Sequence, residues 1–137
     1  MELLSKKEIE ELTENYPLYS QDEKKGDTKV LYHFFIGSAD WYVFEGSKEG
    51  IAPDGKDNIT LFGIANIIEP EFGYFTLYEL ESTKVPQKII MGGAEFTVNI
   101  EIERDKYFKQ TTLEKLETNE VITEFLINMG YKNRVLI

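Results

Sequence analysis

Hydrophobic residues recur at helical spacing in some segments of this 137-residue chain and alternate with polar residues in others. Near the N-terminus, Ser5 and Glu8 have the spacing of a capping box. Ile9, Leu12 and Tyr16 follow on one helical face. The pattern predicts a first helix from about residue 5 to residue 16.

Three apolar segments, 29–36, 41–45 and 59–68, have the length and composition of strands. Both faces of 29–36 are largely apolar, which predicts a central strand covered on both sides. The glycine-rich, charged segment 46–58 is interpreted as a mobile hairpin loop. Gly63 interrupts the third strand, which indicates a bulge or the close approach of another backbone.

In the second half, the break at Pro70 and Gly73 precedes a short helix over 77–81. Two further strands, 85–91 and 94–103, are separated by Gly92-Gly93, a favoured two-residue hairpin turn. Strict alternation along 94–103 predicts one buried face and one face in water.

Thr111 or Thr112 is expected to begin a short helix, and a last helix is expected to end at Gly130. An apolar stripe on that last helix either caps the core or makes a dimer; it comprises Val121, Phe125, Leu126 and Met129. Short connections favour antiparallel pairing. We therefore predict a single α+β domain over residues 1–137, with a mainly antiparallel sheet of about five strands, an N-terminal helix and C-terminal helices.

Composition narrows the possible chemistry. With 25 acidic residues against 15 Lys and Arg, the net charge is −10, which argues against direct nucleic-acid binding. The lack of cysteine excludes disulfides and thiolate metal sites, and a single histidine excludes a two-histidine site within one chain. Since no apolar run reaches the length of a membrane span and no secretory signal is evident, we expect a cytoplasmic protein that does not contact membranes.

Candidate catalytic chemistry is sparse. A general base at His33 would need a carboxylate partner, and no sequence spacing supplies one, so His33 is interpreted as a structural residue of the sheet face. Glu103 and Asp105 flank Arg104 and could do acid–base work or bind a divalent cation, although alternating acids on a wet strand also serve solubility. We therefore predict no catalytic residue, metal or cofactor.

The acidic excess is concentrated in residues 40–80, which hold eight acidic and two basic residues together with many aromatic ones. Two interpretations remain open for the charge: solubility, or an acidic face that binds a basic protein surface. The aromatic residues either pack the core or form a patch for a partner or a planar ligand. The candidate binding residues are Asp40, Trp41, Tyr42, Glu45, Glu49, Asp54, Asp57, Glu103, Arg104 and Asp105.

Several segments, taken in order, carry a family resemblance: Leu18-Tyr19-Ser20-Gln21, His33-Phe34-Phe35, residues 40–46, Leu61-Phe62-Gly63, residues 71–81 and residues 102–108. Residues 3–117 resemble the bacterial family known as domain of unknown function 2958. The segments after Gly46 and around 91–97 depart from its pattern, and 118–137 is an extra C-terminal helix outside it. The family has no established activity, and its members are typically carried by plasmids, conjugative elements and phages.

The resemblance implies an accessory protein of mobile DNA. The leading hypothesis is a non-enzymatic protein that binds a host or element-encoded partner with a basic surface, for example a nuclease of host defence, and inhibits it in the manner of an anti-CRISPR or anti-restriction protein. The alternative is a binding protein or sponge for a nucleotide-like ligand. A weaker alternative is a metal-assisted hydrolase that uses Glu103 and Asp105.

Overall fold

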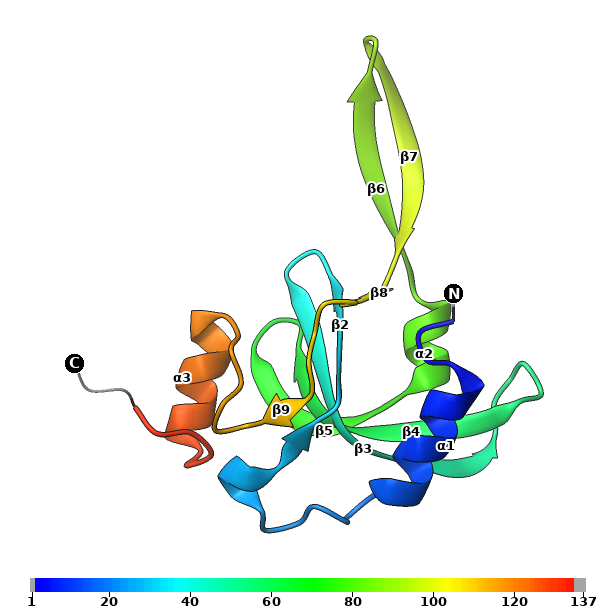
Figure 1. Cartoon of the computed structure of the whole chain (residues 1–137). Helices are drawn as coiled ribbons and strands as arrows, with labels where there is room; N and C mark the ends of the chain where they lie inside the picture. Colours follow the sequence, from blue (N-terminus) through cyan, green and yellow to red (C-terminus); the bar gives the residue numbers. More distant parts are fainter. Residues whose placement is uncertain (1, 135–137) are drawn as a thin grey trace.

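A five-stranded antiparallel sheet forms the centre of the computed structural model, which describes residues 2–134 (Figure 1). The strand order is β5-β4-β3-β2-β8. The strands are β2 (Tyr32–Ile36), β3 (Ala39–Ile51), β4 (Asp57–Asn66), β5 (Pro70–Thr76) and β8 (Glu103–Arg104). With helices on both faces of the sheet, the single α+β domain predicted from the sequence is confirmed.

Short polar signals define the helices α1 (Lys6–Asn15), α2 (Leu77–Ser82) and α3 (Glu120–Asn128), and a 3₁₀ turn η1 spans Lys25–Asp27. The predicted capping box of α1 is present: Glu8 N donates to Ser5 Oγ at 3.1 Å, and Ser5 N donates to Glu8 Oε1 at 2.9 Å. Asn119 caps α3, and its side-chain oxygen accepts from Ile122 N. None of the helices in residues 2–134 is long and apolar enough to cross a membrane.

The sheet separates two hydrophobic clusters, so both of its faces are covered. The first cluster lies on the side of α1 and α2 and includes Phe34, Trp41 and Leu61. The second lies on the side of α3 and includes Tyr42 and Phe44 from β3. Successive residues of β3 therefore serve opposite cores, which explains why apolar residues run consecutively there.

Gly63 marks a bulge, as its sequence context predicts. The pairing of β3 with β4 shifts register between Val43 and Glu45, opposite Gly63 and Phe62. A Cβ atom at residue 63 would overlap the carbonyl oxygen of Tyr42 and lie 2.9 Å from its carbonyl carbon. Glycine therefore permits the close backbone approach at the centre of the sheet.

Three predicted boundaries are wrong. The segment 46–58 is not a loop, because β3 and β4 continue through it as paired strands and leave only residues 52–56 between them. Pro70 and Gly73 do not break the chain but lie within β5, where an edge position tolerates a missing N–H donor. The predicted strand 29–36 is interrupted at Leu31, which separates β1 (Lys29–Val30) from β2.

No helix begins at Thr111 in the described chain. Residues Thr111–Thr112 instead form β9, which pairs with β1 in a separate two-stranded sheet. Leu113 and Leu116 follow in turns, and both are almost fully buried in the second cluster. Their spacing is that of a helix, but they anchor an irregular segment through side-chain burial and through backbone hydrogen bonds such as Leu113 N to Thr28 O at 2.9 Å.

The hairpin of β6 (Lys84–Met91) and β7 (Ala94–Glu101) differs most from what the sequence pattern predicts. Its Gly92-Gly93 turn and its pairing are as predicted. However, the hairpin is not part of the five-stranded sheet and projects away from the body (Figure 1). The alternation along β7 is real, but no other element of residues 2–134 covers its apolar face, which makes the predicted buried face wrong.

Candidate functional site

His33 lies between two carboxylates, which corrects the expectation that it has no acidic partner. Its Nε2 atom is 2.8 Å from Asp40 Oδ1, and its Nδ1 atom is 2.9 Å from Asp105 Oδ2. The imidazole stacks on the Tyr42 ring with 4.3 Å between centroids, and the Phe108 ring lies beside this stacked pair, 6.0 Å from His33 and 5.9 Å from Tyr42. The cluster joins β2, β3 and the segment after β8.

All the hydrogen-bonding atoms of this cluster are engaged. Asp105 Oδ1 accepts from Tyr107 N, and Asp40 Oδ2 accepts from the Asn119 side chain at 3.3 Å. The hydrogen bond from His33 lowers the pKa of Asp105. A general base needs a ring nitrogen directed at its substrate, whereas both nitrogens of His33 face carboxylates in this structure. The cluster thereby holds three segments of the chain together.

Arg104 is also fixed by a partner distant in sequence. Its two terminal nitrogens each donate to Glu8, both at 2.7 Å, and the guanidinium lies 5.1 Å from the centre of the Tyr32 ring. These charge-assisted hydrogen bonds lower the pKa of Glu8 to about 2. Arg104 thus connects β8 to the first turn of α1.

We expect Glu8→Gln to lower the free energy of unfolding by about 2 kcal/mol at pH 7. Glutamine keeps the capping box but loses the ion pair. Because the pKa of Glu8 is lowered by folding, its contribution is present above about pH 4.5 and is lost as the pH falls toward 2. Urea unfolding at pH 7 and pH 2 should therefore show a difference between variant and wild type only at pH 7.

The exposed ion pair of Glu124 and Arg134 supplies the control for this experiment. Glu124→Gln should leave the unfolding midpoint unchanged.

Three of the candidate binding residues are buried. Trp41 and Tyr42 contribute to the two cores, and burial raises the pKa of the Tyr42 hydroxyl. Glu45 is 3% exposed, and its carboxylate accepts hydrogen bonds from the backbone N–H groups of Tyr19 and Gln21 at 2.9 and 2.8 Å. These side chains support the fold and the loop after α1, and they offer little surface to a partner.

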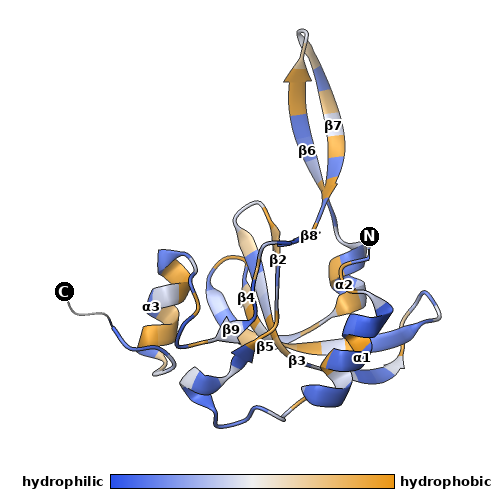
Figure 2. Cartoon of the chain, viewed as in Figure 1, coloured by the Kyte–Doolittle hydropathy of each residue, from blue (hydrophilic) through white to orange (hydrophobic). Residues whose placement is uncertain are grey.

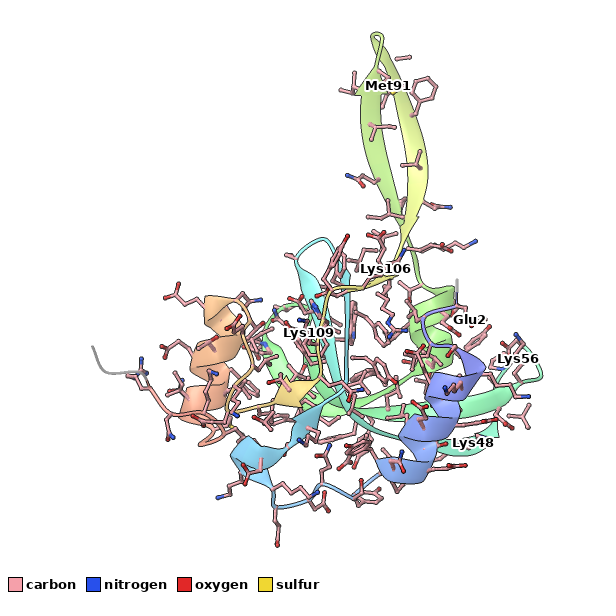
Figure 3. The ribbon with its side chains drawn as sticks, in the orientation of Figure 1. Glu2, Lys48, Lys56, Met91, Lys106 and Lys109 are labelled. Atoms are coloured by element: carbon pink, nitrogen blue, oxygen red, sulfur yellow. The ribbon has the colours of Figure 1, made fainter. Side chains whose placement is uncertain are left out.

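Asp40 and Asp105 meet at His33, whereas the remaining four acidic candidates are exposed and are not gathered into one site. Glu49, Asp54 and Asp57 lie on the β3–β4 arm, and Glu103 lies on the edge strand β8. Asp54 and Asp57 border a cleft of about 370 Å³ between that arm, α1 and α2. Since the cleft is also lined by Lys6, Lys48 and Lys56, it carries mixed charge; Figure 3 labels two of these lysines at the end of the arm.

Aromatic side chains line a smaller cavity of about 160 Å³ beside the loop after α1. Phe44, Phe62, Phe72 and Tyr131 line it together with polar residues, among them Gln21, Asp22 and Thr28. Ligand pockets usually have about 300–1,000 Å³. The aromatic residues therefore meet mainly as packing partners, with Phe72 5.0 Å from the rings of both Phe125 and Tyr131.

The projecting β6–β7 hairpin carries the most distinctive surface. Paired residues of an antiparallel ladder share a face, so the register divides the hairpin into two faces. One face is apolar except for Gln87 and comprises Val85, Ile89, Met91, Ala94, Phe96, Val98 and Ile100. We call this set the apolar hairpin face. The opposite face carries Lys88 and Glu95, which form an ion pair at 3.6 Å.

Much of the apolar hairpin face is open to solvent. Met91 is 66% exposed, Phe96 is 49% exposed, and Ile90 on the opposite face is 78% exposed, so the tip is apolar on both sides. Figure 2 shows hydrophobic residues along both strands, and Figure 3 places Met91 near the tip, far from the labelled residues of the body. The period of β7 revealed this face in the sequence, but not that it is uncovered.

Fold and site together define an α+β domain with one long hairpin outside its core and with a histidine cluster that joins three segments of the chain. The chain matches the family described as "Protein of unknown function (DUF2958)" over residues 3–117, and it belongs to that family. The resemblance inferred from its motifs is thereby confirmed. Neither the curated proteins nor the solved structures gave a match to the chain.

Proposed function

We propose that this chain is a non-enzymatic accessory protein of a mobile genetic element that binds a protein partner, with the β6–β7 hairpin as its contact element. The observation that supports this proposal is the apolar hairpin face, which nothing in residues 2–134 covers. An isolated two-stranded hairpin is marginally stable in water, and exposed apolar patches commonly mark sites of protein contact. Binding of a partner would bury the apolar hairpin face.

The size of the hairpin indicates how a partner would hold it. Eight residues per strand make a ribbon about 26 Å long and, with side chains, about 10 Å wide. One face therefore offers about 260 Å², and two hairpins packed face to face would bury about 500 Å² in total, well below the ~1,200 Å² of stable complexes. A groove that encloses both faces of the tip would bury more, which favours a different protein over a second copy.

Charge adds a second property of the partner. The hairpin contains two lysines and two glutamates and is neutral, so the net charge of −10 belongs to the rest of the chain. A basic surface around the partner's groove would attract this body and speed association. A nuclease of host defence has such a surface in its nucleic-acid channel, so inhibition of that kind of enzyme is the specific activity that we propose.

The alternatives have less support in the geometry. A nucleotide-like ligand would need a larger aromatic pocket than the cavity beside Phe44 and Phe62. A hydrolase that uses Glu103 and Asp105 would need Asp105 to be free, whereas both of its carboxylate oxygens already accept hydrogen bonds.

The test is affinity capture from the cytosol of the host, with three versions of the full chain. The apolar-face variant carries Ile89→Thr and Phe96→Thr, a cross-strand pair on one face. The control variant carries Lys88→Thr and Thr97→Ser, the adjacent pair on the opposite face. Mass spectrometry should find a protein that the wild type and the control retain and that the apolar-face variant loses by about tenfold or more.

Two results would overturn the proposal. One is capture that is the same for all three versions, or absent for the wild type. The other is a stable dimer of the purified wild type, measured by light scattering, that the apolar-face variant converts to a monomer, because the second copy would then be the occupant. Raising the salt concentration should slow association if the acidic body steers it.

A further inference from the structure

A second apolar surface lies on α3, which is well separated from the hairpin in Figure 1. It borders a shallow, widely open groove of about 560 Å³ between α3 and the start of β5. The groove is lined by Glu69 from the β4–β5 connection, by Pro70 at the start of β5, and by Glu120, Val121, Glu124, Phe125 and Asn128 from α3. We call it the α3 groove.

Helix α3 has more apolar surface than its own core uses. Ile122 and Leu126 are fully buried and attach the helix to the sheet. Val121 is 58% exposed and lies in the α3 groove. The stripe predicted from the sequence thus divides: Leu126 caps the core and Phe125 packs partly against it, whereas Val121 and Met129 face outward.

The connection that leads into the groove is also apolar. Ile68 is 97% exposed and Ile67 is 65% exposed, directly before Glu69. Turns favour Gly, Asn, Asp, Ser and Pro for conformational reasons, and none of those reasons calls for two consecutive isoleucines in water. Exposing these two isoleucine side chains to water costs free energy, and that cost is removed when another molecule covers them.

The charge of the groove specifies what would cover it. Its charged lining residues are the three glutamates Glu69, Glu120 and Glu124. Arg134 donates two hydrogen bonds to Glu124 at 2.8 and 2.9 Å and offsets its charge, so the acidic character of the rim comes from Glu69 and Glu120. An apolar floor with an acidic rim fits an apolar side chain flanked by Lys or Arg.

The same charges disfavour the other occupants. Two copies related by a two-fold axis would bring glutamate rims together, and like charges in contact weaken association. Nucleic acid and anionic lipid would be repelled for the same reason. We infer that the α3 groove binds a short segment of another protein that carries apolar and basic residues in alternation.

The inference is independent of the hairpin and is tested with synthetic peptides. The probes are fluorescein-labelled (Lys-Leu)₄, (Glu-Leu)₄ and (Lys-Ser)₄, each titrated against the full chain and followed by anisotropy. We expect saturable binding of (Lys-Leu)₄ that is at least about tenfold tighter than that of the other two, since both the apolar and the basic elements contribute. Amide NMR shifts should be confined to residues 67–69 and 120–128.

Three variants locate the binding. Glu69→Gln with Glu120→Gln changes the rim. Val121→Ser with Ile68→Ser changes the apolar surface in the groove and in the connection beside it. Glu10→Gln with Glu49→Gln removes two charges elsewhere. We expect the first two to weaken binding by at least about tenfold and the third by less than about twofold. Equal weakening by all three would show a general attraction of basic peptides to an acidic chain and would overturn the inference, as would shifts that map outside the groove. The hairpin variant with Ile89→Thr and Phe96→Thr should bind (Lys-Leu)₄ like the wild type.

Discussion

Replacing Gly63 with alanine is expected to lower the free energy of unfolding by about 4 kcal/mol, which is among the largest effects of a single added methyl group. The added Cβ would overlap the carbonyl oxygen of Tyr42 and lie 3.2 Å from Val43 Cα. Both contacts are with backbone atoms of the neighbouring strand, so no side-chain rotation can relieve them. The bulge between β3 and β4 would have to open, and with it the centre of the sheet.

Gly73 is the matched control for this experiment. It lies directly opposite Gly63 in the β4–β5 ladder, and a Cβ there would meet no heavy atom within 4 Å. Gly73→Ala should therefore change stability by less than about 1 kcal/mol, and a small gain is expected because alanine restricts the unfolded chain. Urea denaturation should give a much lower unfolding midpoint for Gly63→Ala than for Gly73→Ala. Similar midpoints would show that the close backbone approach at Gly63 does not require glycine.

Features set by neighbouring residues could be predicted from the sequence. The capping box of Ser5 and Glu8 and the turn at Gly92-Gly93 depend on contacts a few residues apart, and both are present. The central position of β2 followed from its two apolar faces. The alternation of β7 also predicted a strand correctly, but periodicity records which face is apolar and not which molecule covers it.

The candidate site was harder to predict because its contacts are long-range. Asp105 lies 72 residues from His33, and Glu8 lies 96 residues from Arg104. The contact between Asp40 and His33 could have been predicted, because the predicted turn after Ile36 joins 29–36 and the next strand in a hairpin. Register across that turn pairs Asp40 with Phe35, two residues from His33, so Asp40 is a diagonal neighbour of His33 on the same face of the sheet. The register of this predicted hairpin would therefore have identified Asp40 as a carboxylate partner of His33, which the sequence spacing by itself did not.

Glu45→Ala is expected to lower the free energy of unfolding by about 3 kcal/mol, because it leaves two backbone N–H groups without their acceptor. The loop after α1 depends on this carboxylate: Tyr19 has a positive φ of 74°, and Gln21 is buried and bonded to β1 and β3. Amide hydrogen exchange at Tyr19 and Gln21 should accelerate more than exchange in α3.

Two further variants serve as controls. Glu45→Gln retains one acceptor oxygen and should lose about half as much stability, whereas Glu49→Ala, exposed on the same strand, should lose almost none. If exchange at Tyr19 and Gln21 were unchanged in Glu45→Ala, the carboxylate would not be what holds the loop, and the place of Glu45 among the candidate contact residues would have to be considered again.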